Sequence, residues 1–158
     1  MAVRSGYSGL QIGLHWVIAV LIVSAWWTGD GARSALDAYE ETAAAPGFVP
    51  HVALGLAILA LVVLRVIVRL TRGAPEAPGV PGSLPVRAAG WGHLLIYVLM
   101  IAVPLGGISA WFLGLETGDI HALFANVLMV VVLGHTAFAL YHQYVVKDGL
   151  LRRMMKAG

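Results

Sequence analysis

Six histidines are the residues of this 158-residue chain that are best suited to chemistry. The chain has no cysteine, which excludes disulfides, thiolate metal clusters and cofactors attached through thioether bonds. Imidazole nitrogens are therefore the only strong soft-metal ligands available. The sequence holds no nucleic-acid motif, phosphate-binding loop or catalytic triad, so we expect no nucleic-acid partner. The histidines are His15, His51, His93, His121, His135 and His142.

The histidines toward the C-terminus predict two levels of ligands. His121 and His135 are 14 residues apart, and on a helix this spacing returns to within about 40° of the same face and spans about 21 Å. Two ligands on one face, one in each half of a bilayer, suit two haems placed one above the other along the membrane normal. His51 lies at the level of His121 and is the expected second ligand there.

The second ligand beside His15 has two candidates. His135 and His142 are 7 residues apart and lie on nearly the same helix face, so geometry alone does not separate them. With His142 the two irons would lie about 31 Å apart, which is the full hydrocarbon thickness. Because tunnelling weakens exponentially with distance, we favour His135.

Glycines flank three of these candidate ligands. Gly13 is close to His15, Gly55 follows His51 by one turn, and Gly134 precedes His135. A residue without Cβ lets a flat macrocycle approach the helix backbone. Close packing between membrane helices favours glycine as well, so this observation alone does not indicate a cofactor.

The chain is too apolar to cover itself with a polar surface. Charged residues make up 11% and apolar residues 59%, whereas a soluble domain has about 25% charged residues. A membrane-spanning helix needs about 20 mostly apolar residues. Four segments meet this condition, so we predict an all-α, four-helix transmembrane bundle that forms a single membrane domain over residues 1–158, without a cleavable signal peptide. The predicted spans are residues 10–27, 48–70, 91–113 and 120–146.

The connecting segments differ in character. Residues 29–47 are polar and acidic and are predicted to form a loop. Residues 72–87 are rich in proline and glycine and cannot be helical throughout. Residues 114–119 form a very short turn, so the third and fourth helices are expected to be antiparallel neighbours.

Charge predicts the orientation of the bundle. The side that contains both termini and the proline-rich linker holds two acids, Glu76 and Asp148. Its bases are Arg4, Arg65, Arg69, Arg72, Arg87, Lys147, Arg152, Arg153 and Lys156. The opposite side has one base, Arg33, and the acids Asp30, Asp37, Glu40, Glu41, Glu116 and Asp119. Because basic residues concentrate on the cytoplasmic side of membrane proteins, both termini are predicted to be cytoplasmic.

Four stretches of the chain resemble the bacterial cytochrome b561 family. They are YSGLQIGLHW (residues 7–16), HVALG followed by RVIVRL (residues 51–70), GHLLIY with a later PLGG (residues 92–107), and HALFAN followed by GH and YHQYVVKDGLLRRMM (residues 121–155). Together they extend over nearly the whole chain. Their combination is specific to the family, although no single stretch is.

The resemblance implies a multi-pass cytochrome of the bacterial inner membrane that holds two haems b through pairs of histidines. It implies that His15 and His135 bind the inner haem, and that His51 and His121 bind the outer one. It also implies electron exchange with membrane quinone, with ubiquinone as the expected electron partner.

Further polar residues at the inner end are candidates for binding. Arg65 and Arg69 lie four residues apart and could bind the haem propionates, with snorkelling to lipid headgroups as the alternative. His93, His142 and Arg69 are candidates for a quinone site. A quinone carbonyl needs a hydrogen-bond donor and its reduction needs protons, and histidine supplies both near neutral pH.

Several functions are compatible with these features. An iron held by two imidazoles has no open position, which favours electron transfer over oxygen binding. The first interpretation is an electron conduit between quinone and an external redox protein. The alternatives are a superoxide oxidase that reduces quinone, a cytochrome b subunit that anchors a dehydrogenase, and a helical scaffold without cofactor. The acidic outer side would repel an anion such as superoxide.

Overall fold

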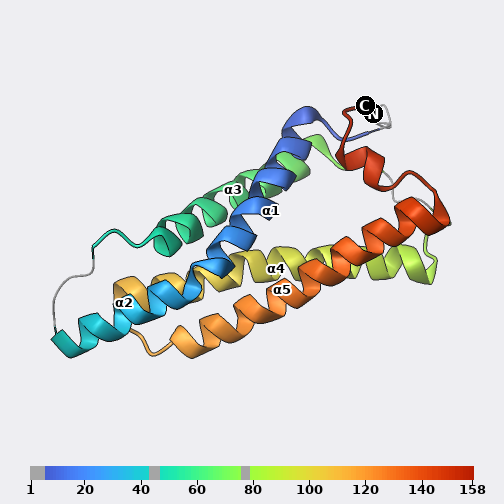
Figure 1. Ribbon diagram of the computed structural model, residues 1–158. Helices are drawn as coiled ribbons and strands as arrows, with labels where there is room; N and C mark the ends of the chain where they lie inside the picture. Colours follow the sequence, from blue (N-terminus) through green and yellow to red (C-terminus); the bar gives the residue numbers. More distant parts are fainter. Residues whose placement is uncertain (1–5, 43–46, 76–78) are drawn as a thin grey trace.

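Helices make up most of the chain (Figure 1). The computed structural model describes residues 6–42, 47–75 and 79–158. The helices are α1 (Gly9–Trp27), α2 (Gly29–Thr42), α3 (Pro50–Arg72), α4 (Leu84–Leu113) and α5 (Gly118–Tyr141). A π-helical turn, His142–Val146, continues α5, and a 3-10 turn, Leu151–Met154, follows it. The described ranges contain no strand, which confirms the all-α prediction.

Four of these helices are long and apolar enough to cross a membrane. They are α1, α3, α4, and α5 together with its π-helical turn, the last running from Gly118 to Val146. Three of the four differ from the predicted spans by one or two residues at one or both ends. The fold is therefore that of a multi-pass membrane protein.

The third apolar helix begins earlier than its hydropathy predicts. α4 starts at Leu84, whereas the predicted span starts at residue 91. Ser83 has extended backbone angles (φ −64°, ψ 154°), and Pro85 lies in the first turn. A proline fits there because its fixed φ suits a helix and its missing N–H has no helical partner in the first turn. The residues before Trp91 continue the helix, and Arg87 is their one charged residue.

The prediction of a loop at residues 29–47 was wrong for most of that segment. Residues 29–42 form the helix α2, in which only Ala32 is buried. Asp30 lies in its first turn, where a carboxylate stabilises the helix dipole. The glycines and acids suggested a loop, but alanine, leucine, arginine and glutamate are strong helix formers and make up half of α2.

The helices pack in two antiparallel pairs, and α3 of one pair contacts α4 of the other. α1 packs on α3, α4 packs on α5, and α3 contacts α4. The short turn between α4 and α5 makes these two helices direct neighbours, as predicted. In it, Gly114 has left-handed backbone angles (φ 63°, ψ 26°), which glycine adopts without steric cost. The buried core at the junction is formed by Ile18, Ile22, Ala25, Ile58, Val62, Leu99, Met100, Val103 and Leu128.

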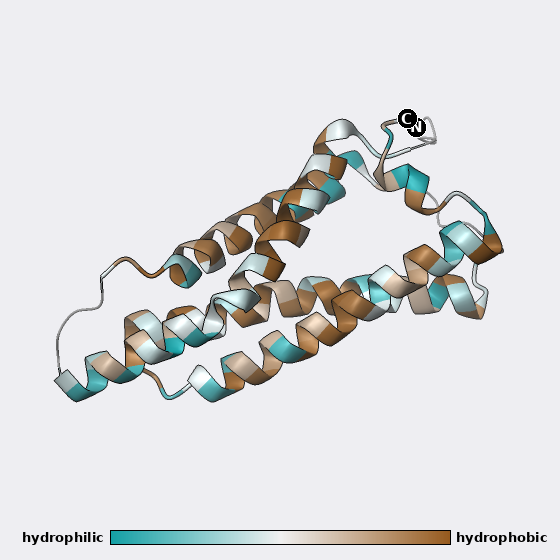
Figure 2. Cartoon of the chain, viewed as in Figure 1, coloured by the Kyte–Doolittle hydropathy of each residue, from teal (hydrophilic) through white to brown (hydrophobic). Residues whose placement is uncertain are grey.

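Most of the apolar surface faces outward instead of into this core. Large apolar side chains are exposed along all four long helices, and hydrophobic residues recur along the length of these helices (Figure 2). On α5 only Leu128 is buried. Such a surface would be unfavourable in water, whereas in a bilayer it faces lipid tails.

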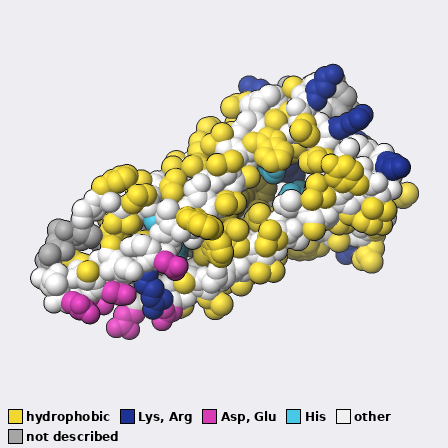
Figure 3. All heavy atoms as spheres, viewed as in Figure 1, with side chains coloured by type: hydrophobic (Ala, Val, Ile, Leu, Met, Phe, Trp, Pro, Cys, Tyr) yellow, Lys and Arg dark blue, Asp and Glu magenta, His cyan; other side chains and the backbone are white. Residues whose placement is uncertain are grey.

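The two ends of the bundle carry opposite charges. Acidic side chains gather around α2 and the α4–α5 turn, and Lys and Arg side chains gather at the other end (Figure 3). At the acidic end Arg33 donates to Asp119 at 2.9 Å and joins α2 to α5. At the basic end the N–H of Gly158 donates to the carbonyl of Tyr7 at 3.3 Å, so the C-terminal residue lies against the segment before α1.

Candidate haem sites

The outer pair of histidines lies near the acidic end. His51 is in the first turn of α3 and His121 in the first turn of α5. Their ring centroids are 5.8 Å apart and the ring planes are nearly perpendicular, at 88°. The packing of α3 on α4 and of α4 on α5 brings these two helix starts together.

Each ring of this pair is held through its Nδ1 atom. Nδ1 of His51 lies 2.8 Å from the carbonyl of Ala25, and Nδ1 of His121 lies 2.8 Å from the carbonyl of Val103. A carbonyl only accepts, so each Nδ1–H donates. The Nε2 atom of each ring is then unprotonated and is the nitrogen that can bind a metal.

An apolar pocket surrounds the outer pair. A cavity of about 60 Å³ lies between the helices here and is partly open to the outside. Apart from the two histidines its lining is almost wholly apolar. The lining residues are Ile22, Ala25, Trp26, His51, Gly55, Ile58, Met100, Val103, Pro104, His121, Ala125, Leu128 and Met129.

Two glycines of α4 make room for the His121 ring. A Cβ at Gly107 would lie 3.1 Å from Cε1 of His121, and a Cβ at Gly106 would lie 3.5 Å from its Cβ. The first distance is too short for an ordinary contact, so a side chain at Gly107 would push the ring aside. The carbonyl of Gly106 also accepts hydrogen bonds from Ser109 and Thr117, which fixes the start of α5 on α4.

The inner histidines form a group of three. His15 on α1 and His135 on α5 have ring centroids 6.4 Å apart. His93 on α4 also lies near His135, at 5.3 Å between ring centroids. In the space-filling view the face between α1 and the C-terminal part of α5 is hollowed, and histidine side chains lie in the hollow (Figure 3). The structure therefore places His135 beside His15.

His142 lies apart from this group. Its ring packs on Phe138 at 4.4 Å between centroids and near Tyr141 at 5.9 Å. Its Nδ1 pairs with a carboxylate oxygen of Asp148. The hydrogen bond from His142 holds the pKa of the Asp148 carboxyl below its usual value.

Arg65 reaches from α3 into the inner group. Its Nη1 donates to the carbonyl of Gln11 at 2.7 Å, and its Nε donates to the hydroxyl of Tyr97 at 3.1 Å. Its Nη2 lies 3.5 Å from Nδ1 of His15. Arg69 lies one turn further along α3.

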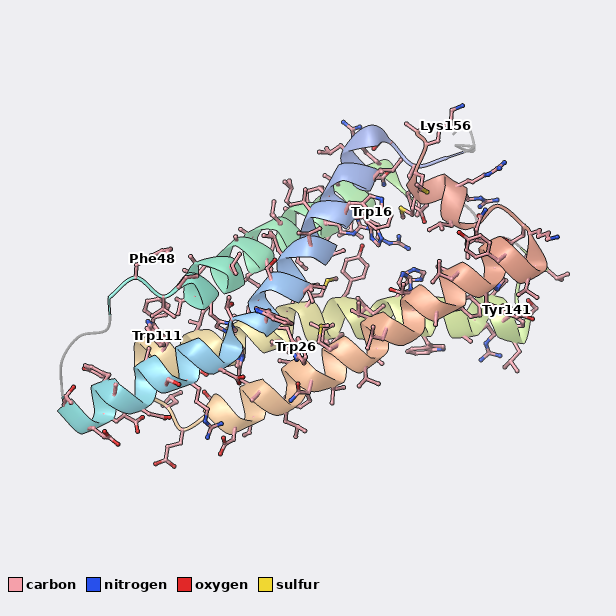
Figure 4. All side chains as sticks on the ribbon, in the orientation of Figure 1. Trp16, Trp26, Phe48, Trp111, Tyr141 and Lys156 are labelled. Carbon is pink, nitrogen blue, oxygen red and sulfur yellow. The ribbon has the colours of Figure 1, made fainter. Side chains whose placement is uncertain are left out.

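The start of α1 and the C-terminal turn enclose the inner level. Ser8 and Gln11 form reciprocal hydrogen bonds at the start of α1, which satisfy otherwise free N–H groups. The buried Gln11 side chain also donates to the carbonyl of Gly73 at 2.9 Å, after the end of α3. Trp16, next to His15, donates from its indole to the carbonyl of Met154 at 2.7 Å (Figure 4).

Both histidine pairs have the separation that a shared iron requires. If each imidazole binds through one nitrogen at about 2 Å, the two ring centroids lie roughly 6 Å apart. The observed values are 5.8 Å and 6.4 Å. Gly55 lines the outer pocket, and a Cβ there would meet no atom within 4 Å. The residues present therefore fit haem at the outer site, and the inner pair has the same spacing.

The comparison with known proteins gives one consistent result. The family described as prokaryotic cytochrome b561 matches residues 6–157. The chain is 39% identical to "Cytochrome b562" of Cereibacter sphaeroides, with 99% of each chain covered. It is 33% identical to "Probable superoxide oxidase CybB" of Yersinia pestis, covering 94% of this chain and 95% of the relative. It is 26% identical to "Cytochrome b561 homolog 1" of Escherichia coli, covering 94% and 96%.

The chain belongs to the prokaryotic cytochrome b561 family. Membership implies a membrane protein of electron transport that carries haem b. The resemblance drawn from the four sequence stretches is thereby confirmed.

Sequence reasoning missed several residues around the histidines. Gly107 was noted only as part of the PLGG stretch, although its small size is what admits the His121 ring. Tyr97 and Gln11 were not singled out as partners of Arg65. The PLGG stretch was a usable signal for the first, because two adjacent glycines in an apolar helix favour close approach. No signal in the sequence pointed to the other two.

Proposed function

We propose that the protein transfers electrons across the membrane through two haems b, each bound by two histidines. The observation that supports this most directly is the presence of two histidine pairs, at 5.8 Å and 6.4 Å between ring centroids, in separate parts of one bundle. His51 and His121 would bind the outer haem, and His15 and His135 the inner one. Bound haem supplies one-electron chemistry with both axial positions filled.

The protein's own residues set the conditions for this chemistry. The carbonyls of Ala25 and Val103 orient the outer imidazoles and keep their Nε2 atoms unprotonated, which strengthens them as ligands. The lining of the outer pocket is almost wholly apolar, which gives a bound group surroundings of low polarity. Arg69 and Arg65 are the candidates for pairing with propionates at the inner level. Arg65 already donates to Gln11 and Tyr97, which favours Arg69 for this role.

We place the protein in the bacterial inner membrane with both termini in the cytoplasm. The basic end of the bundle contains both chain ends, and the acidic end contains α2 and the α4–α5 turn (Figure 3). Basic residues are retained on the cytoplasmic side during membrane insertion. On this arrangement His51 and His121 lie toward the outside.

Membrane quinone is the proposed electron partner at the inner end, with ubiquinone as the expected species. His142, His93 and Arg69 are the proposed polar lining. His142 donates from Nδ1 to Asp148, which leaves its Nε2 to face a quinone oxygen. A histidine in this position can deliver a proton and then recover it from water. His93 donates from Nδ1 to the carbonyl of Ala89 at 2.8 Å and is oriented in the same way.

Haem quantification with a reduced-minus-oxidised absorption spectrum tests the cofactor content. We expect two haems per chain, all of them removed by acid–acetone because the chain has no cysteine. A content near one, or haem that remains attached, would contradict the proposal.

Rapid mixing with quinol tests the quinone site. His142→Ala and His93→Ala variants that retain both haems should oxidise quinol more slowly than the wild type. An exposed substitution on the same bundle, Leu70→Ala, is the control, because Leu70 is 78% exposed and outside both histidine groups. Unchanged rates in both histidine variants, with slower rates in variants near His51, would place the quinone site at the outer end.

A superoxide oxidase that reduces quinone is the second candidate. The 33% identity to "Probable superoxide oxidase CybB" favours it. The excess of acidic side chains at the outer end opposes it, because an anion would be repelled there. Rapid mixing of the oxidised protein with superoxide separates the two: fast haem reduction that is insensitive to ionic strength supports the oxidase. Anchoring of a dehydrogenase is the third candidate, and co-purification of such a subunit would support it.

A further inference from the structure

We propose that Arg65, acting through His15, holds the reduction potential of the inner haem above that of the outer haem. This inference depends on the two-haem function proposed above. It assigns Arg65 a positioning role toward His15, distinct from pairing with propionates.

The two histidine pairs differ in what faces their second ring nitrogens. At the outer level both Nδ1 atoms lie 2.8 Å from backbone carbonyls, of Ala25 and of Val103. At the inner level Nδ1 of His15 lies 3.5 Å from a guanidinium nitrogen of Arg65. An arginine has five donors and no acceptor and remains charged in proteins. The second nitrogen of His15 therefore meets a cationic donor where the outer ligands meet acceptors.

This difference has opposite effects on an iron bound at each level. An imidazole that donates from Nδ1 to a carbonyl becomes a more basic ligand. A more basic ligand stabilises the oxidised iron, which carries the larger positive charge, and so lowers the potential. A cation beside the ligand destabilises the oxidised iron by repulsion, which is strong in a low-dielectric interior. The inner haem is therefore the better electron acceptor.

The position of Arg65 does not depend on His15. Its Nη1 and Nε donate to Gln11 and Tyr97 at 2.7 Å and 3.1 Å, so helices α1 and α4 hold the guanidinium in place. In the described part of the chain no carboxylate forms an ion pair with Arg65. Among the described residues its charge therefore has no acidic partner and remains available to act on His15.

The proposal predicts the direction of electron transfer between the two haems. If the inner potential is the higher one, an electron that enters at the outer level moves to the inner level with a decrease in free energy. That direction leads from the acidic end toward the proposed quinone site at the basic end.

Potentiometric titration followed by haem absorption tests the proposal. Each haem takes up one electron in the titration, and single-haem variants assign the two values: His121→Ala leaves the inner haem and His15→Ala leaves the outer one. We expect the inner potential to be the higher in the wild type. Arg65→Gln should lower it enough to change the ratio of reduced to oxidised inner haem about tenfold, or 59 mV for one electron. Arg65→Lys, which keeps the charge, should largely restore it.

Arg72→Gln is the matched control, since Arg72 is an exposed arginine at the end of the same helix. It should change neither potential, and the outer haem should be unaffected in every Arg65 variant. Equal or inverted potentials in the wild type would overturn the proposal, as would an unchanged inner potential in Arg65→Gln. A haem content of one per chain would instead refute the two-haem function itself.

Loss of the inner haem from Arg65→Gln would prevent the measurement of its potential. Arg65→Met, which is uncharged and has no donors, then provides the second measurement. If neither neutral variant retains the inner haem while Arg65→Lys does, Arg65 binds propionates and the proposal is wrong.

Discussion

In this cytochrome, hydrogen bonds made by one ring nitrogen of a histidine determine which of its nitrogens can bind a metal. His51 and His121 donate from Nδ1 to carbonyls of neighbouring helices, so their Nε2 atoms are left as ligands. Both carbonyls belong to residues in the buried core, Ala25 and Val103. The outer site is therefore oriented before any cofactor enters.

Substitution of one ligand should remove one haem and leave the other. We expect His121→Ala to lose the outer haem and His15→Ala to lose the inner one, because the two pairs are held by separate contacts. Haem content per chain and the low-spin absorption bands provide the measurement. Loss of both haems in either variant, in protein that remains folded by circular dichroism, would show that the sites are not independent.

The same measurement distinguishes His135 from His142 as the inner ligand. The structure places His135 next to His15, and His142 next to Phe138 and Asp148. His135→Ala should therefore lose about half of the haem, whereas His142→Ala should retain it. A full low-spin spectrum in His135→Ala together with a deficient one in His142→Ala would reverse the assignment.

At the scale of the helix, the important feature of α4 is the absence of side chains at Gly106 and Gly107. Gly106 and Gly107 leave space beside the start of α5, where the His121 ring lies. Val103 and Pro104, earlier in the same turn, line the outer pocket, and Val103 supplies the carbonyl that orients that ring. Close approach of α4 and α5 and orientation of the outer ligand thus depend on one turn of helix.

Gly107→Ala should weaken the outer site. The added Cβ would lie 3.1 Å from Cε1 of His121, and overpacking of this kind costs roughly 1–3 kcal/mol. We expect about tenfold faster loss of the outer haem to apomyoglobin, an acceptor of free haem. Gly106→Ala is the matched control, since its Cβ would make an ordinary contact at 3.5 Å. Equal rates in the two variants would show that the His121 ring adjusts without cost.

α2 packs at the acidic end of the bundle but contributes no residue to the lining of the outer pocket. It follows α1 directly after Thr28, and the ion pair between Arg33 and Asp119 joins it to the start of α5. Both partners are largely exposed, so the pair contributes little to stability. Its effect is to hold α2, with its acidic side chains, at the end of the bundle where His51 and His121 lie in the first turns of α3 and α5.

For the whole molecule, the opposite charges of the two ends predict the orientation. Fusion of a reporter that is active only in the cytoplasm should give activity at the C-terminus, after Gly158. Fusion of a reporter that is active only outside should give activity in the α4–α5 turn, after Glu116. The opposite result would invert the assignment of inner and outer haems, and with it the direction of electron transfer.

Much of this architecture follows from the sequence alone. Four apolar stretches of sufficient length predict four spans because a bilayer requires internally bonded helices of that length. The spacing of His121 and His135 places both on one face of α5 because positions within one helix follow its fixed period. The family resemblance rested on the same stretches and was confirmed over residues 6–157.

Only the tertiary structure decided how side chains of different helices meet. Helical spacing alone did not separate His135 from His142 as the neighbour of His15, although tunnelling distance favoured His135. The packing places His135 there with His93 beside it. Nothing in the sequence placed Arg65 against His15, Tyr97 and Gln11. The physical reason is that the helical period determines positions along one helix. The rotation and crossing of two helices depend on packing across the whole interface.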